Sequence, residues 1–431
     1  MTRGANDHPG GSALSQGVIE EVGKIGRADI LVGIPSYGDS ETIAHVITTA
    51  GEGMDRYYPG LKGVIVNAYS ADDADKTTHQ AALDAPVPPG IEKIVAHYSG
   101  LAGKGSAFRM IFEIADRLGA RIVVTLDADL RSIKPTWIKL LADPVFKLNY
   151  GFVTPYYLRH KHDGTITNSI VYPLTRALYG RRVRQPIGGE FCFTGALAKI
   201  YAHQQVWNTD IARFGIDVWM TTTAITEGFR LAQASMGVKL HDDKDPSSDL
   251  MPMFKQVTGT LFKLMGENEV RWMAVGSSED VFIYGPQRRV REPKGKDAKP
   301  VKLLAHFRAG WREHQAFLRH YLSPANYNGL AVVADTPDDA FHFPEELWAR
   351  IVYDFAVAYN FSGEDPELIV GYLTPIYYGR TASFVLEAAG MSDVMVEALI
   401  EGQARLYEDN KDYLIKRWTQ AKQAATERNR I

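Results

Sequence analysis

Two aspartates that directly follow a short apolar run are the first residues in this sequence whose type and spacing suit chemistry. Residues 123–126 read VVTL, and Asp127 and Asp129 come immediately after them. Alternate residues of an extended chain point to the same side, so the two carboxylates share one face and repel each other. A folded chain keeps such a pair when something positive offsets it.

A divalent cation bound to phosphate oxygens is one positive partner that suits this pair. Carboxylates are hard ligands for Mg²⁺ or Mn²⁺, and the metal spreads the charge of a leaving diphosphate. His241 follows another apolar run and is placed to close a metal site from a loop. The alternative is that Asp127 and Asp129 only end a strand and cap the next helix, and that His241 is structural.

Lys104 is a candidate for binding an anion. It lies between two glycines in the stretch GLAGKGSAF, directly before a helical pattern. Glycines let the backbone approach a ligand closely, and a helix N-terminus favours negative charge. The spacing of a P-loop is missing, so we expect contact with a diphosphate outside that motif. The simpler alternative is an exposed lysine in the turn before a helix.

Two further acids follow glycines. In QPIGGE, residues 185–190, Gly188 and Gly189 permit close backbone approach, and Glu190 is suited to accept hydrogen bonds from the hydroxyls of a sugar. A tight turn with a capping glutamate is the alternative. Asp217 follows Gly215 at the start of a predicted helix, where capping alone would explain it.

Alternating apolar runs and helical stretches from residue 29 onward predict the elements that position these residues. Runs of about five residues between amphipathic helices indicate an α/β fold, with a mainly parallel sheet and helices on both faces. Ligands bind beyond the carboxyl ends of the strands of such sheets. The stretches PSYGDSE, NAYSADD and DAD all fall at these ends.

The chain is long enough for two domains, and its character changes near residue 250. We expect residues 1–27 to be a flexible tail, residues 28–250 to form the ligand-binding domain, and residues 251–431 to be mainly helical. The helical part would cover the active site or build a homodimer. A basic, Pro- and Gly-rich stretch at 285–300 is typical of a solvated loop.

Composition narrows the classes of function. A formal charge of −3 over 431 residues gives no electrostatic case for a nucleic-acid partner. The single cysteine, Cys192, excludes an internal disulfide. No window reaches the roughly 18 apolar residues of a membrane span, and the N-terminus lacks the apolar run of a secretory signal. We expect a soluble cytoplasmic protein.

Six motifs taken together carry a family resemblance. PSYGDSETI, GKG, DAD, QPIGGE, FGID and the late His241 resemble, in their order and intervals, the retaining nucleotide-sugar glycosyltransferases of GT-A fold. Members of that group make mannosylglycerate, glucosylglycerate and glucosyl-3-phosphoglycerate. The resemblance covers residues 29–250 and extends to the helical part only in general layout. It implies transfer of glucose or mannose from a GDP- or UDP-linked donor to a small hydroxy acid, giving a compatible solute.

The resemblance also implies roles for individual residues. Asp129 and His241 would bind Mg²⁺ or Mn²⁺, and Asp217 would be the acid near the reaction centre. Lys104 and Glu190 would join Asp217 as catalytic residues. The residues implied to bind the nucleotide sugar are Pro35, Tyr37, Glu41, Ser70, Asp72, Lys104, Asp127, Gly188, Gly189 and Glu190.

The acceptor side of the resemblance lies in YYLRHKHDGTITN. Arg159, Asp163 and Thr167 align with the segment that holds glycerate in mannosylglycerate synthases. An arginine clamps a carboxylate through two parallel N–H donors. The sequence lacks the glycine-rich stretch that the phosphoglycerate enzymes use for the acceptor phosphate, which favours unphosphorylated glycerate. Lys161 and His162 keep 3-phosphoglycerate open as the alternative.

Two other classes of function also fit the motifs. A sugar-phosphate nucleotidyltransferase likewise uses a strand-end acidic pair and a glycine-flanked lysine, but it releases inorganic diphosphate. A sugar-nucleotide sensor would bind the same ligand without turnover and dock a partner through its helical part.

Overall fold

The chain folds into two compact units, each assembled from several segments. The computed structural model describes residues 11–71, 76–240, 250–286 and 299–428. Residues 1–158, 187–242 and 281–293 belong to the first unit, and residues 159–186, 243–280 and 294–431 to the second. The second unit thus takes in residues 159–186, which the sequence analysis assigned to the domain of residues 28–250.

The first unit is built on a sheet that has eight strands in the described part of the chain, in the order β10-β8-β5-β7-β4-β1-β2-β3. Strand β7 runs antiparallel to both β4 and β5, and the other neighbouring pairs are parallel. The strands are β1 (Ile30–Ser36), β2 (Gly63–Tyr69), β3 (Ile91–His97), β4 (Ile122–Thr125), β5 (Phe152–Leu158), β7 (Phe191–Thr194), β8 (Leu231–Val238) and β10 (Phe282–Tyr284).

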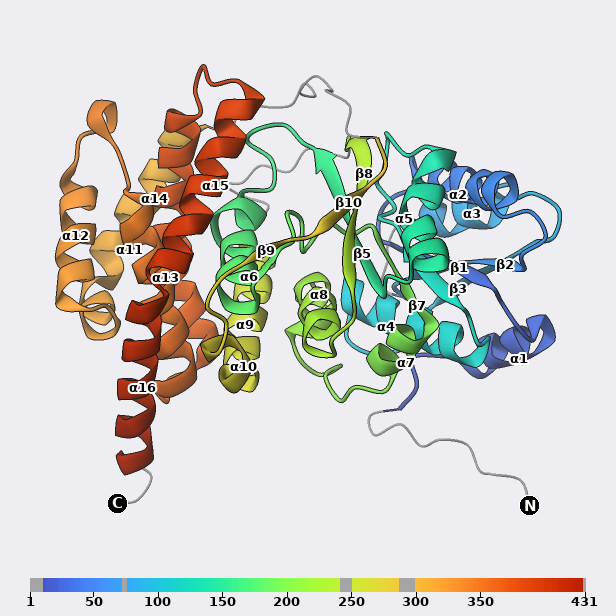
Figure 1. Ribbon diagram of the computed structural model, residues 1–431, viewed down its shortest axis with the longest axis horizontal. Helices are drawn as coiled ribbons and strands as arrows, with labels where there is room; N and C mark the ends of the chain where they lie inside the picture. The colour runs from blue at the N-terminus through green and yellow to red at the C-terminus, as the bar shows by residue number, and fades with distance from the viewer. Residues whose placement is uncertain (1–10, 72–75, 241–249, 287–298, 429–431) are drawn as a thin grey trace. The chain divides into compact units, whose positions relative to one another are not determined.

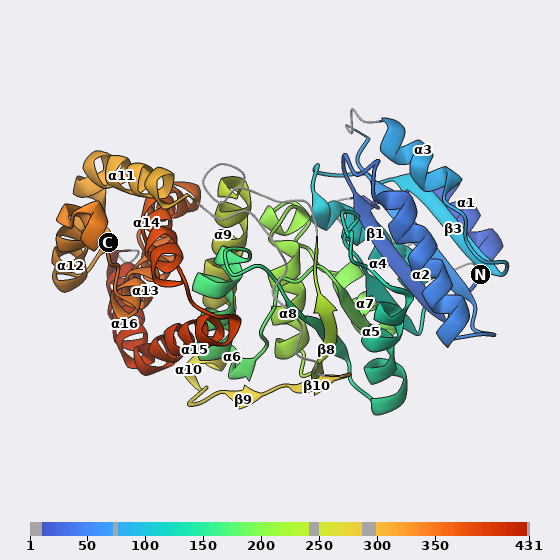
Figure 2. The same ribbon diagram turned by 90° about the horizontal axis from the view of Figure 1, so that it is seen from above.

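Helices cover both faces of this sheet (Figure 1). On one face, α2 and α5 lie side by side and share a buried apolar cluster with alternate residues of β1 and β4 (Figure 2). On the other face, α4 and α7 pack together, and Phe112 of α4 contacts Phe193 and Tyr201. The helices of this unit are α1 (Gln16–Ile25), α2 (Ile43–Tyr57), α3 (Lys76–Asp84), α4 (Lys104–Arg117), α5 (Pro135–Leu148), α7 (Gly195–Ala202), the 3-10 turn η2 (Asp210–Ala212) and α8 (Ile216–Thr226).

Local sequence explains where these helices begin. Ser15 caps α1 by accepting a hydrogen bond from the backbone N–H of Val18, and Val18 and Val22 are buried. Residues 16–25 therefore form an ordered helix, although the sequence analysis placed them in the flexible tail. In α4, Phe108, Ile111 and Phe112 recur at helical spacing and are fully buried. These three residues belong to the buried core.

Cys192 lies at the centre of the sheet. It is fully buried in β7, where it pairs with Val124 of β4 on one side and Val153 of β5 on the other. Burial raises the pKa of its thiol well above the ordinary value. Cys192 is therefore an inert core residue, as its apolar surroundings in the sequence indicate.

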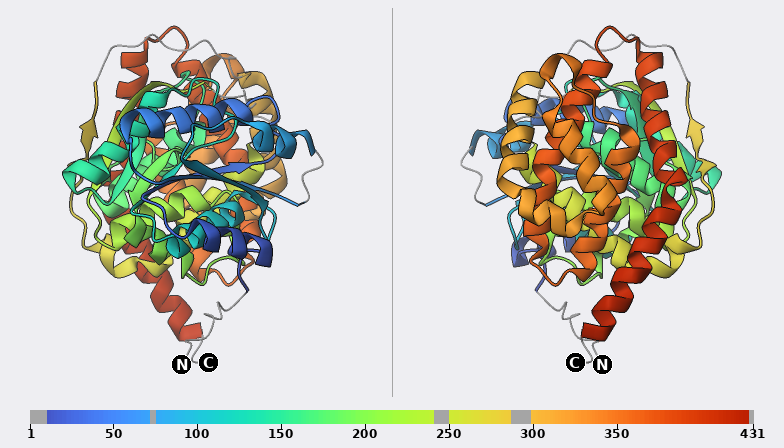
Figure 3. Two further views of the ribbon diagram at one scale, coloured as in Figure 1. Left: turned by 90° about the vertical axis from the view of Figure 1, so that its right-hand side faces the viewer. Right: turned by 90° about the vertical axis from the view of Figure 1, so that its left-hand side faces the viewer.

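The second unit is helical and appears mostly in orange and red in Figure 3. Its helices are the π-helical turn η1 (Thr167–Val171), α6 (Tyr172–Tyr179), α9 (Met251–Glu267), α10 (Glu269–Met273), α11 (Pro300–Tyr321), α12 (Pro324–Asp335), the 3-10 turn η3 (Asp338–Ala340), α13 (Glu345–Phe361), α14 (Pro366–Glu387), α15 (Asp393–Asp409) and α16 (Lys411–Arg428). Two short strands, β6 (Arg181–Arg182) and β9 (Glu279–Asp280), pair with each other.

Buried arginines join helices within this second unit. The guanidinium of Arg176 on α6 lies 2.6 Å from a carboxylate oxygen of Glu401 and 2.8 Å from one of Glu408, both on α15. Such pairs satisfy charges that would be costly to bury alone.

Within the described ranges, every helix is too short or too polar to cross a membrane. The predicted fold class, a mainly parallel α/β sheet with helices on both faces and a helical C-terminal region, is confirmed.

Candidate active site

The carboxyl ends of β1 and β2 bring together residues that the sequence analysis assigned to the nucleotide. The two strands pair in parallel with Ser36 opposite Tyr69, so Tyr37 and Ser70 leave the sheet at the same edge. Pro35 is buried within β1 and Ser70 is buried after β2, while Tyr37 is 67% exposed. Asp72, the other candidate in this segment, lies outside the described residues.

An ion pair joins the segment after β1 to the segment after β4. The guanidinium of Arg131 lies 3.0 Å from a carboxylate oxygen of Glu41. Both side chains are largely exposed, so the pair contributes little to stability. It does place Glu41 at the same sheet edge as the strand-end aspartates.

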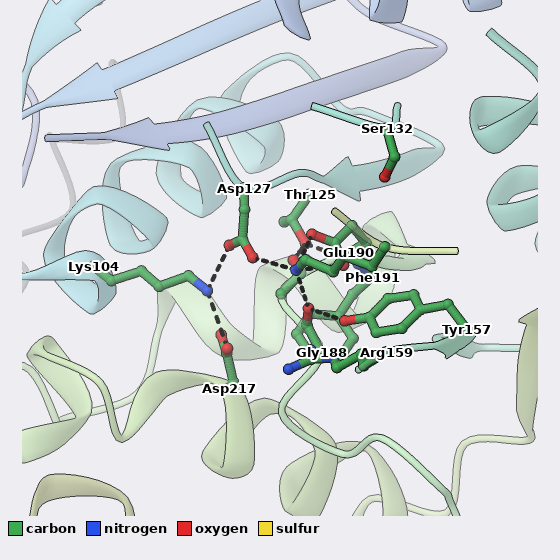
Figure 4. Close-up of polar contacts among 12 residues, drawn as sticks. Lys104, Thr125, Asp127, Ser132, Tyr157, Arg159, Gly188, Glu190, Phe191 and Asp217 are labelled. Carbon is green, nitrogen blue, oxygen red and sulfur yellow. Dashed lines mark hydrogen bonds and ion pairs between the residues drawn. The ribbon is translucent and has the colours of Figure 1, made fainter. Parts of the chain in front are cut away.

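Lys104 bridges two aspartates that are 90 residues apart in the sequence. Its ammonium lies 2.9 Å from Oδ1 of Asp127 and 3.0 Å from Oδ2 of Asp217 (Figure 4). Lys104 is the first residue of α4, Asp127 follows β4, and Asp217 is the second residue of α8. Three predicted site residues therefore meet in one charged cluster.

A second lysine, Lys239, completes the cluster, and the sequence analysis missed it. Its ammonium lies 2.8 Å from Oδ2 of Asp127 and 2.8 Å from Oε1 of Glu190. Lys239 comes one residue after β8, at the carboxyl end of a strand that lies between β10 and β5 in the sheet. In the sequence, the signal that could have identified Lys239 is its position two residues before His241. The cluster is a continuous chain of alternating charge that runs through Asp217, Lys104, Asp127, Lys239 and Glu190.

The turn that carries Gly188 and Gly189 is fixed to the strands beside it. The Tyr157 hydroxyl donates to the carbonyl of Gly188 at 2.7 Å, and the Thr125 hydroxyl donates to that of Gly189 at 3.0 Å (Figure 4). Gly189 has a φ of +86°, and a Cβ there would lie 2.3 Å from Oδ2 of Asp127. The close approach that the paired glycines predicted is thus to a carboxylate of the protein itself.

The glycines around Lys104 likewise make room for the protein's own backbone. A Cβ on Gly105 would lie 1.8 Å from the carbonyl oxygen of Ile211, and the Gly105 N–H donates to the carbonyl of Arg213 at 3.1 Å. The structure thus gives these glycines a packing role, and their role in ligand approach stays a prediction. They let the N-terminus of α4 pack closely against η2, the 3-10 turn that shortly precedes Asp217 in the chain.

The charges in this cluster shift one another's pKa values. Burial alone would raise the pKa of Asp127, but Lys104 and Lys239 outweigh burial and hold it well below the ordinary value. Burial would lower the pKa of Lys104, yet Asp127 and Asp217 raise it. For Asp217, burial raises the pKa, Lys104 opposes that effect, and Asp127 adds to it, so the pKa ends above its usual range. Strongly shifted groups at a strand-end edge are typical of functional sites.

Asp129 differs from Asp127 in having its carboxylate uncommitted. In the part of the chain that the structure describes, Asp129 makes no hydrogen bond or ion pair, and it is half-buried. His241, its predicted partner in a metal site, lies outside the described residues. The residue before it, Leu240, is bonded to the segment after Asp129: its carbonyl accepts from the Arg131 N–H at 3.0 Å, and its N–H donates to the Ser132 hydroxyl at 2.9 Å. Among described residues, no group of three metal-ligating side chains occurs.

The predicted acceptor residues lie in the second unit. Arg159 directly follows β5, and its guanidinium is 3.8 Å from Oδ2 of Asp163. Thr167 begins the π-helical turn η1 and is buried. Arg159 and Asp163 thus form a pair, and all three residues belong to a unit separate from the cluster around Lys104.

No protein-family model and no curated protein matches the chain. Solved structures that it resembles include glucosyl-3-phosphoglycerate synthase from Mycobacterium tuberculosis with Mg²⁺ and uridine diphosphate, at 21% identity and a TM-score of 0.43, covering 57% of this chain and 83% of that one. The same synthase with Mn²⁺, uridine diphosphate and glucosyl-3-phosphoglycerate matches at 22% identity and a TM-score of 0.43, covering 59% and 86%. These values leave the chemistry of this chain to be inferred from its own residues.

Proposed function

We propose that the chain is a retaining, divalent-metal-dependent glycosyltransferase of GT-A fold. It would move glucose or mannose from a GDP- or UDP-linked donor to D-glycerate or a closely related small hydroxy acid. One observation carries this proposal: the buried chain of alternating charge from Asp217 to Glu190 lies at the carboxyl edge of a mainly parallel sheet. Ligands of such sheets bind at that edge.

Lys104 is suited to bind the diphosphate. An ammonium group has three N–H donors, and in the described part of the chain those of Lys104 meet two carboxylates, Asp127 and Asp217. One donor therefore stays available for a phosphate oxygen. A fixed positive charge aimed at the leaving diphosphate stabilises the charge that develops there during transfer.

Asp129 and His241 are the proposed ligands of Mg²⁺ or Mn²⁺. The uncommitted carboxylate of Asp129 fits this role, whereas Asp127 is already bound by two lysines. The strand-end site holds two ammonium groups against the carboxylates of Asp127, Asp129, Asp217 and Glu190, a formal charge of −2 that a divalent cation offsets. When bound, the metal neutralises charge on the departing diphosphate.

The nucleotide and the donor sugar would extend along the same sheet edge. Pro35, Tyr37, Glu41, Ser70 and Asp72 are the proposed contacts for the nucleotide.

The paired glycines and the acids beside them would face the donor sugar. Glu190 is fully buried with both carboxylate oxygens on Lys239, at 2.8 and 3.1 Å, so it reaches a sugar hydroxyl only when the turn of Gly188 and Gly189 opens. We therefore give Asp127, which is partly exposed, the first contact with the donor sugar.

Asp217 is the proposed group beside the acceptor hydroxyl. Its Oδ2 binds Lys104, whereas its buried Oδ1 has no hydrogen-bond partner in the described residues. That oxygen is suited to orient the C2 hydroxyl of glycerate. The bond from the sugar to phosphate breaks as the bond to the acceptor oxygen forms on the same face, and the acceptor proton passes to the leaving phosphate oxygen.

Arg159, Asp163 and Thr167 are the proposed acceptor ligands, with Arg159 on the carboxylate of glycerate. The sequence lacks the glycine-rich stretch that the phosphoglycerate enzymes use for the acceptor phosphate, which supports an unphosphorylated acceptor. Glycerate is therefore proposed ahead of 3-phosphoglycerate, the alternative acceptor.

An activity screen tests the proposal. UDP-glucose, GDP-glucose and GDP-mannose are each offered with D-glycerate, 3-phosphoglycerate or glycerol in the presence of Mg²⁺ or Mn²⁺. We expect release of a nucleoside diphosphate and a glycerate product that keeps the anomeric configuration of the donor by NMR. Release of inorganic diphosphate from a sugar phosphate and a nucleoside triphosphate would instead identify a nucleotidyltransferase. Binding of a nucleotide sugar without turnover would identify a sensor.

A further inference from the structure

Lys239 occupies a position that differs from that of Lys104, although both contact Asp127. Its side chain is only 3% exposed, against 17% for Lys104. Its backbone N–H donates to the carbonyl of Leu158 at 3.1 Å, which continues the pairing of β8 with β5 by one residue. Lys239 is therefore fixed in the sheet, while Lys104 stands at the start of a helix.

All three donors of Lys239 are used by the protein. Its ammonium contacts Oδ2 of Asp127 at 2.8 Å, both carboxylate oxygens of Glu190 at 2.8 and 3.1 Å, and the carbonyl of Gly188 at 3.1 Å. An ammonium group offers three N–H donors, and these partners account for them. Lys239 thus has no donor left for a phosphate or a sugar, in contrast to Lys104.

The contacts run from a fully buried carboxylate to a partly exposed one. Glu190 has no exposure to solvent and faces Lys239, and Lys239 faces Asp127, whose carboxylate is 22% exposed. The ring of Tyr157 lies against the Lys239 ammonium, 5.4 Å from it to the ring centroid. Because one carboxylate oxygen of Asp127 is held by each lysine, rotation of that carboxylate would break at least one ion pair.

We propose that Lys239, held in place by Glu190, is a positioning residue that fixes the Asp127 carboxylate at the donor-sugar site and does not itself contact substrate. This inference rests on the proposed function, because it presumes that Asp127 meets the donor sugar. It assigns to Glu190 a supporting role behind Lys239. A carboxylate whose orientation is set before the substrate arrives needs no reorganisation during transfer.

The test compares Lys239→Met with Lys104→Met. Each change removes one ammonium and keeps a side chain of similar length. Titration calorimetry with UDP and GDP, in the presence of Mg²⁺, measures diphosphate binding, and steady-state kinetics with the nucleotide sugar measures use of the donor. Lys93→Met is the matched control, since Lys93 is a half-buried lysine of the same sheet whose ammonium bonds carbonyls of Ala82, Leu83 and Ala85.

We expect Lys239→Met to bind the nucleoside diphosphate within about twofold of the unsubstituted protein, while kcat/KM with the nucleotide sugar falls by about 100-fold, the usual scale for losing a preorganised group. Lys104→Met should lose diphosphate binding itself. Lys239→Arg keeps the charge and should recover part of the lost kcat. Diphosphate binding lost equally in both methionine variants would overturn the inference, as would unchanged kinetics in Lys239→Met.

A double substitution covers the case in which Lys239→Met fails to fold. Removing the ammonium alone leaves Glu190 buried without its counter-ion, so Lys239→Met/Glu190→Gln should unfold at a higher denaturant concentration than Lys239→Met. Its kcat/KM should stay as low as that of the single variant, because Asp127 still lacks its support. Recovery of full activity in the double variant would contradict the positioning role. If neither UDP nor GDP binds the unsubstituted protein, the proposed function fails, whereas the denaturant comparison still tests whether Glu190 and Lys239 depend on each other.

Discussion

Asp127 and Asp217 contact the same ammonium group of Lys104, yet the cluster shifts their pKa values in opposite directions. Asp127 has a second lysine, and its pKa falls well below the ordinary value. Asp217 is more deeply buried, and among the described residues it forms an ion pair with Lys104 alone, so burial, reinforced by the charge of Asp127, prevails over both lysines and its pKa rises. The two aspartates are therefore expected to respond to the same substitution in opposite ways.

Asp217→Asn should lower kcat by at least about 100-fold without destabilising the fold. The pKa of Asp217 is higher in the folded chain than in the unfolded chain, so folding favours the protonated carboxyl group. At neutral pH, where Asp217 would be ionised in the unfolded chain, its charge therefore lowers the free energy of unfolding. Asparagine resembles the neutral acid. Thermal unfolding at pH 7 in buffer without divalent cations should give an equal or higher melting temperature, and the difference should close as the pH falls and Asp217 itself becomes protonated. A clearly lower melting temperature at pH 7 would contradict this assignment.

Asp127→Asn should destabilise the protein at neutral pH, on the order of 3 kcal/mol, because it leaves two lysines short of a counter-charge. The depressed folded-state pKa of Asp127 contributes stability that is present above the ordinary pKa of aspartate, about 3.9. That contribution is lost as the pH falls through the folded-state value. Urea unfolding of both proteins at pH 7 and near pH 3 should show the gap narrowing in acid. A gap that stays constant would count against the ion pairs.

Asp129→Asn separates metal binding from stability. Because Asp129 makes no hydrogen bond or ion pair within the described ranges, the substitution should leave the melting temperature unchanged without metal. It should abolish the increase in melting temperature that Mn²⁺ gives the unsubstituted protein. In the unsubstituted protein, chelation of the metal should weaken nucleotide binding at least about 10-fold. An undiminished Mn²⁺ effect in Asp129→Asn would exclude this residue as a ligand.

Gly189→Ala should disrupt the site through a collision with Asp127. The added Cβ would lie 2.3 Å from Oδ2 of Asp127, and the φ of +86° adds strain. Gly228→Ala is the control, because Gly228 has a similar φ of +78° but no atom within 4 Å of the added Cβ. Both variants should lose about 1 kcal/mol from backbone strain. Only Gly189→Ala should also lose most of its activity, and equal activity in the two variants would refute the collision.

Arg159→Ala should remove the preference for an acceptor with a carboxylate. The expected result is a KM for D-glycerate at least about 10-fold higher, with the KM of the nucleotide sugar unchanged. Glycerol lacks the carboxylate, so its turnover should be unaffected. Competition between glycerate and glycerol in one reaction, read by NMR of the products, measures the ratio directly. A preserved ratio would show that another group binds the carboxylate.

Residues close in sequence were the easier part to predict. Local patterns mark the strand-end aspartates, the glycine-flanked Lys104, the GGE turn and the helix that begins near Asp217. Each of these features contributes a residue to the cluster, although Asp129 is not part of it. The positive partner of Asp127 was not predicted, because Lys239 lies 112 residues away and carries no motif of its own. The role of Lys239 depends on the parallel pairing of β8 with β5, and this pairing is seen only in the folded sheet.

The extent of the helical unit was equally hidden from sequence. Residues 159–186 follow a strand of the sheet, and their pattern resembles the segments before them. They join the second unit because α6 packs on α15, through Arg176 and its two glutamates more than 200 residues away. The short α1 was missed because Gly and Ser around it suggested a tail, while its cap at Ser15 and two buried valines are enough to order it.

The place of Cys192 has a practical consequence. Since the chain has only this thiol, and it lies in the middle of the sheet two residues after Glu190, a thiol-reactive dye reaches it only when the centre of the sheet opens. The native chain thus contains its own single-position label. Its rate of modification reports how often the strands beside the charged cluster separate, and the slowing of that rate by a ligand gives a binding assay that needs no turnover.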